Sequence, residues 1–182
     1  MRMKKLADTG EKRMLWRRII IYAIAFFILG ILQCAFFSRL KPFGATPDLL
    51  LGGICAVMLL DDKKAAAVCA VGAGYFIDAL GAVPPSFSPL FYLLCVASVG
   101  MVTDKLMPGL ASFVLSILPA ALLGVVRTYV SMWVSFSALP PLTGVWTVLL
   151  RELAATVLFC IPVYFVIKLC TVPIDAKGRF ST

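Results

Sequence analysis

Six apolar runs separated by short loops constrain the fold of this 182-residue chain more than any other feature. A bilayer core about 30 Å thick needs about 20 helical residues, and fewer where the helix ends are polar. Apolar residues make up 62% of the chain and charged residues 14%, which excludes a soluble domain and a disordered chain. We therefore expect an all-α, polytopic membrane bundle of about six transmembrane helices. The runs are 19–37, 49–60, 65–83, 90–103, 109–136 and 145–169.

The second run, residues 49–60, is the shortest, and as a helix it covers about 18 Å. It can cross the membrane if Pro47-Asp48 and Asp61-Asp62 extend it into the headgroups. A re-entrant second segment, with five full spans elsewhere, is the alternative.

The distribution of Lys and Arg predicts the orientation. With a cytoplasmic N-terminus, the outer loops hold Arg39 and Lys41, and nearly all other basic residues face inside. By the positive-inside rule both termini are cytoplasmic, which requires an even number of spans. We expect three parts: a basic leader (residues 1–18), one transmembrane domain (19–170) and a cytoplasmic tail (171–182).

The basic leader resembles the start of a signal peptide, but no small-residue cleavage site follows the first apolar run. We expect the leader to be partly disordered, because Asp8, Gly10 and Glu11 interrupt its basic residues. We also expect it to contact anionic lipid, which accounts for the formal charge of +8 without any nucleic-acid partner.

The residue types present argue against catalysis. Histidine is absent, which excludes Ser-His-Asp and Cys-His catalysis and any His-ligated metal. The 6 Cys residues lie in apolar segments with no C-x-x-C pair, so a packing role is expected. No nucleotide-binding or hydrolase motif occurs. We expect no enzymatic activity, no cofactor and no metal.

Four ionisable residues lie inside the predicted spans, all in the outer half of the membrane: Asp78, Arg127, Arg151 and Glu152. Because a charge at mid-bilayer costs at least about 2.5–3.5 kcal/mol, such residues usually face protein or water. We expect Asp78 and Arg127 to pair, since their spans both run outward, with Arg151 and Glu152 extending the network. Alternatively, Arg151 and Glu152 merely reach the outer interface. The polar contact either locks helices together or receives a partner helix or a small ligand.

The third span also carries a stripe of small residues, in which Ala66, Ala70 and Gly74 precede Asp78 at intervals of four. Such stripes let helix backbones approach closely in lipid. The stripe packs either against another span of this chain or against another protein.

Three segments together resemble MreD, the rod shape-determining membrane protein family of bacteria. Pro47, Leu49 and Leu50 match the family's helix start, and Gly74 and Asp78 match its glycine and aspartate. The resemblance covers residues 47–105, with hydropathy alone agreeing elsewhere, and the loop with Pro84 and Pro85 departs from it. The segments are Thr46-Pro47-Asp48-Leu49-Leu50-Leu51, Asp61-Asp62-Lys63-Lys64 and Gly74-Tyr75-Phe76-Ile77-Asp78-Ala79-Leu80.

The resemblance implies a non-enzymatic component of the cell-wall elongation machinery in the bacterial plasma membrane. Such a protein associates with MreC and works with the MreB filament and the wall synthases. The resemblance also implies a fold related to the substrate-binding subunits of energy-coupling-factor vitamin transporters.

That fold relation supplies an alternative function, in which Asp78 and Arg127 line a pocket for a small ligand near the outer face. Many of these subunits carry Ala-x-x-x-Ala in the first span, but here Phe27 follows Ala23 at that spacing.

Overall fold

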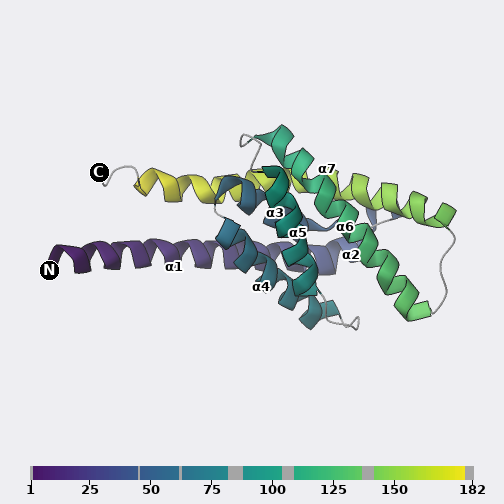
Figure 1. The fold of residues 1–182 in the computed structure, drawn as a ribbon, viewed down its shortest axis with the longest axis horizontal. Coiled ribbons are helices and arrows are strands. Elements are labelled where there is room, and N and C mark those ends of the chain that lie inside the picture. Colours follow the sequence, from purple (N-terminus) through teal and green to yellow (C-terminus); the bar gives the residue numbers. More distant parts are fainter. Residues whose placement is uncertain are drawn as a thin grey trace.

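The computed structural model describes residues 2–44, 46–61, 63–81, 88–103, 109–136 and 142–178, and these are helical almost throughout (Figure 1). No strand occurs among them, so the all-α prediction is confirmed for this part of the chain. The elements are α1 (Arg2–Ile31), the π-helical segment η1 (Leu32–Phe37), α2 (Ser38–Leu40), the 3-10 turn η2 (Pro42–Gly44), α3 (Leu49–Leu60), α4 (Lys63–Gly81), α5 (Ser88–Thr103), α6 (Leu110–Phe136) and α7 (Leu142–Gly178).

The short helix α3 is the centre of the molecule. It contacts α1, α4, α5, α6 and α7, and its residues from Leu49 to Met58 are all buried. A helix that is apolar on every side is stable when other helices surround it. The predicted run 49–60 therefore forms the core around which the other helices pack.

The remaining helices enclose α3 in a fixed lateral order. Contacts join α1 to α4, α4 to α5, α5 to α6, and α6 to α7. In Figure 1, α1 and α7 run along the long axis of the molecule, and α4, α5 and α6 cross it obliquely. Since α5 contacts both α4 and α6, it lies between them.

Both terminal helices are longer than expected and project from the same end of the molecule (Figure 1). The expectation of a partly disordered leader is wrong for residues 2–18, which are helical and continuous with the first predicted span. Extension of an existing helix avoids the unfavourable nucleation step. A single glycine such as Gly10 destabilises the helix by only about 1 kcal/mol relative to alanine. At the other terminus, α7 continues to Gly178, well into the predicted tail. Pro84 and Pro85 lie outside the described residues.

Two helical segments are long and apolar enough to cross a membrane, Trp16–Leu40 and Leu150–Thr171. Leu49–Leu60, Ser88–Thr103 and Leu110–Gly124 are shorter apolar helices. Many large apolar side chains are exposed on the outer faces of the bundle. Examples are Ile24, Phe27 and Ile28 on α1 and Leu158 and Phe165 on α7. These features are compatible with a membrane protein.

Candidate functional site

A polar cluster surrounds the N-terminus of α3. Asp48 is the N-cap residue, and its Oδ1 accepts a hydrogen bond from the backbone N–H of Leu51 at 3.0 Å. The hydroxyl of Tyr92, fully buried on α5, lies 3.1 and 3.0 Å from Oδ1 and Oδ2 and donates to this carboxylate. A carboxylate at this position also interacts favourably with the positive end of the helix dipole.

Side chains of η1 and α7 complete the contacts at the start of α3. Gln33 of the π-helical segment accepts a hydrogen bond through Oε1 from the backbone N–H of Leu50 at 3.0 Å. The backbone N–H of Asp48 donates to Thr156 Oγ1 at 3.3 Å, and Cys160 Sγ donates to the Asp48 carbonyl oxygen at 3.5 Å. N–H groups in the first turn of a helix have no partner within the helix. Here Gln33 of η1 supplies the partner for Leu50, and the N-cap Asp48 supplies the partner for Leu51.

Arg127 of α6 lies at the edge of this cluster and is held by α5. Its Nη2 donates to Ser88 Oγ at 2.7 Å, and its guanidinium lies 5.0 Å from the centre of the Phe91 ring in a cation–π contact. Its positive charge is close enough to the carboxylates of Asp48 and Glu152, the latter partly buried on α7, to interact with them electrostatically. Two of the four predicted ionisable residues, Arg127 and Glu152, therefore lie near the Asp48 cluster, without a direct hydrogen bond or ion pair to Asp48 among the described residues.

The predicted pair between Asp78 and Arg127 is wrong. No hydrogen bond or ion pair between described residues involves Asp78. The reason is the lateral order of the helices: α5 lies between α4 and α6, so Arg127 meets Ser88 and Phe91 of α5 first. The prediction used the height of each residue along its helix, which does not determine which helices are neighbours.

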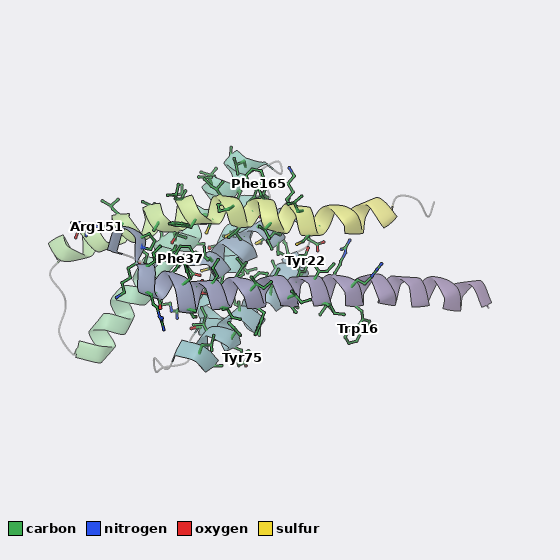
Figure 2. All side chains as sticks on the ribbon, turned by 180° about the vertical axis from the view of Figure 1, so that it is seen from behind. Trp16, Tyr22, Phe37, Tyr75, Arg151 and Phe165 are labelled. Atoms are coloured by element: carbon green, nitrogen blue, oxygen red, sulfur yellow. The ribbon has the colours of Figure 1, made fainter. Side chains whose placement is uncertain are left out.

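Arg151 lies apart from the cluster. Its side chain is exposed, and Figure 2 shows it toward the end of the bundle opposite the two termini. Its guanidinium lies beside Gly44 of η2. Of the two alternatives for the Arg151–Glu152 pair, Arg151 agrees with a position at the outer interface, whereas Glu152 is partly buried and interacts electrostatically with Asp48 and Arg127.

The small-residue stripe of α4 packs inside the chain. Ala66, Ala70 and Gly74 are buried, and a Cβ placed on Gly74 would collide with the backbone of Pro89. Gly74 therefore lies at the contact between α4 and α5, and the burial of all three residues inside this chain agrees with the first of the two alternatives for the stripe.

A second polar contact joins helices near the end of α3. Asp61, the C-cap residue, forms an ion pair with Arg18 of α1 at 3.0 Å and accepts a hydrogen bond from the Tyr22 hydroxyl at 2.8 Å. Thus the continuous helix of α1 and η1 is fixed to both ends of α3, through Gln33 of η1 at one end and through Arg18 and Tyr22 of α1 at the other.

The polar groups of the cluster join helices to one another. Every buried side-chain nitrogen or oxygen atom among the described residues has a hydrogen-bond partner. Within the same part of the chain, no three His, Cys, Asp or Glu side chains are close enough to hold a metal ion. The cysteines are free thiols, and Cys55, Cys95 and Cys160 are buried in the core. The hydrogen bonds of the cluster therefore join η1, α3, α5 and α7 to one another.

Asp48 and Tyr92 are the site residues that the sequence reasoning missed. An Asp directly before an apolar run, preceded by proline, is the pattern of a helix N-cap, and this signal was available. Tyr92 gave no comparable signal, because its partner lies 44 positions away.

Comparisons of the chain with protein families, with curated proteins and with solved structures found no match.

Proposed function

We propose that this chain is a non-enzymatic protein of the bacterial plasma membrane that acts as a scaffold in the cell-wall elongation machinery, as MreD-type proteins do. The positions of the residues that carry the MreD resemblance support the proposal most. Pro47, Leu49 and Leu50 are buried at the start of the central helix, and Gly74 lies where α4 and α5 approach closely. Four of the five residues that resemble the family are thus packed inside this bundle, and Asp78 is the exception.

A six-span topology with cytoplasmic termini is part of this proposal. It is supported by the two span-length helices and by the exposed apolar side chains on the outer faces. The projection of both terminal helices from one end also agrees with an even number of spans (Figure 1). In this orientation Trp16 lies near the inner membrane surface, with the basic residues of α1 beyond it on the cytoplasmic side, close to anionic lipid.

The scaffold role is supported by the closed character of the polar cluster. Its buried groups are satisfied by one another, so the cluster needs no ligand to complete it. The expected partners are a single-span MreC-like protein and, through the machinery, the MreB filament and the wall synthases.

One observation favours the alternative, a substrate-binding subunit of an energy-coupling-factor transporter. Arg127 and Glu152 are only partly buried, and both interact electrostatically with Asp48 at the start of α3. A small polar ligand entering from the outer face would meet these two side chains first.

Purification of the full chain from its native membrane in mild detergent tests both functions. The scaffold proposal expects recovery of a single-span MreC-like protein, and depletion of the chain should convert rod-shaped cells to spheres. Recovery of a bound vitamin-like molecule, or of a complex with an ATPase, would replace the scaffold by the transporter subunit.

A further inference from the structure

One side of α4 is an apolar face that the described residues leave open. Val68 and Tyr75 are 69% and 67% exposed, and Gly72 and Ala79 are exposed as well. Spacings of four, three and four residues place these positions on one side of a helix. Figure 2 shows Tyr75 at the outer edge of the bundle, directed away from the other helices. We refer to Val68, Gly72, Tyr75 and Ala79 as the α4 outer face.

Gly72 leaves room on this face for the close approach of another helix. A Cβ placed on Gly72 would have no atom within 4 Å, whereas a Cβ on Gly74 would collide with Pro89. A glycine inside a helix costs about 1 kcal/mol relative to alanine. For Gly74 the close contact with α5 offsets this cost, but the described chain gives Gly72 no such contact. Close approach of a helix from another molecule would provide one.

Asp78 adds a charge beside the same face, three residues after Tyr75. Two residues earlier, Phe76 packs against Phe27, with ring centroids 5.5 Å apart, and against Gly30 of α1. Gly30 is about 21 Å along α1 from Trp16. If Trp16 marks the inner membrane surface, Gly30 lies within a hydrocarbon core about 30 Å thick. In the proposed orientation Asp78 therefore lies in the outer half of the membrane, and no described residue forms a hydrogen bond or an ion pair with it. A carboxylate at that depth is costly without a partner.

Resting on the proposed scaffold function, we propose that the α4 outer face docks one membrane-crossing helix of a partner protein, and that this helix carries a Lys or Arg in its outer half that pairs with Asp78. The apolar side chains of the partner helix pack beside Val68 and Tyr75, and the two backbones approach at Gly72. The cation satisfies Asp78 through charge-assisted hydrogen bonds and discriminates against helices that carry an acidic residue at this depth.

The charge of Asp78 also argues against a second copy of this chain as the occupant. Two copies in the same membrane orientation, related by a two-fold axis along the membrane normal, present the same patch to each other. Their Asp78 carboxylates would then face each other at equal depth, and like charges in a medium of low dielectric constant repel. A cationic partner helix removes this conflict.

Photo-cross-linking in native membranes tests the proposal. A photoreactive residue is placed at Val68, at Tyr75, or, as a control, at the exposed Leu122 of α6, and cross-linked peptides are identified by mass spectrometry. Cross-links from positions 68 and 75 should reach an apolar segment that contains Lys or Arg, and position 122 should not reach that segment. Asp78→Asn should reduce the cross-link yield at least tenfold, and Asp78→Glu should retain most of it.

The two neighbouring glycines provide a matched pair of variants. Gly72→Leu should keep the thermal stability of the purified chain, because the position is open, but it should abolish the cross-links from position 75. Gly74→Leu should destabilise the chain itself, because it meets the Pro89 backbone. Unchanged cross-linking in stable Gly72→Leu protein would overturn the proposal.

The other outcomes also decide the question. Cross-links only to lipid, to a second copy, or to a segment without a basic residue would overturn docking of a cationic helix, as would a yield unaffected by Asp78→Asn. If the MreC-like protein co-purifies but does not cross-link to positions 68 and 75, the result supports the scaffold function and excludes the α4 outer face as the docking site. If neither co-purification nor cross-linking finds a partner, both proposals fail.

Discussion

The hydroxyl of Tyr92 donates a hydrogen bond to the carboxylate of Asp48 at 3.0 Å and thereby joins α5 to the N-terminus of α3. The same carboxylate accepts the backbone N–H of Leu51, so one side chain both caps the central helix and fixes a neighbouring helix against it. This dual role makes Asp48 the position where local helix structure and the packing of the bundle are most directly coupled.

Replacement of Tyr92 by Phe keeps the ring but removes the donor. It should lower the free energy of unfolding by about 1–3 kcal/mol, because a partly buried carboxylate loses a hydrogen bond. Thermal unfolding of the purified protein in detergent measures the change. Tyr75→Phe is the matched control, since the Tyr75 side chain is 67% exposed, and it should leave stability unchanged. Equal losses in the two variants would contradict the assigned role of Tyr92.

Asp78→Asn and Arg127→Leu should have additive effects on stability, because the two side chains do not interact. By contrast, Arg127→Leu and Ser88→Ala remove the two partners of one hydrogen bond and should show a coupling energy of about 0.5–3 kcal/mol. Double-mutant cycles on thermal stability give both quantities. A clear coupling between Asp78 and Arg127 would restore the pair that the structure does not show.

Deletion of Ala35 should be tolerated. A π-helical turn holds one residue more than an α-helical turn, so the deletion lets residues 32–37 become α-helical while Gln33 and Phe37 keep their contacts. Deletion of Ala25, within the regular part of α1, rotates one half of the helix by about 100° against the other and should prevent folding. Size-exclusion profiles and thermal stability distinguish the two. Equal damage from both deletions would show that the π-helical turn is not a removable insertion.

Labelling of single cysteines tests the topology. In a background where the native cysteines are replaced by alanine, Arg39→Cys should react with a membrane-impermeant maleimide added to intact spheroplasts. Lys63→Cys and Lys177→Cys should react only after permeabilisation, because the positive-inside rule places them in the cytoplasm. Reaction of position 177 from outside would exclude the six-span arrangement.

Helix positions could be predicted from this sequence, but helix neighbours could not. The run 49–60 coincides with α3 because acidic residues bound it on both sides, and local composition carries that information. The sequence places Asp48 in the headgroup region, but in the structure it is partly buried. Its burial depends on Tyr92 and Thr156, which lie 44 and 108 residues later in the chain, so local sequence cannot reveal it. The pairing of Asp78 with Arg127 failed for a related reason, because rise per residue gives depth and not the order of helices around α3.

The enclosure of α3 has a consequence for biogenesis. A helix of 12 residues is too short to remain stably inserted by itself, and its polar N-terminus needs partners that lipid cannot offer. Gln33 is already synthesised when α3 leaves the ribosome, but Tyr92 and Thr156 are translated afterwards. The contacts from Tyr92, Thr156 and Cys160 to the start of α3 therefore form last, so a nascent chain that stops before α7 keeps the Asp48 N-cap but lacks the contacts that α7 makes to it.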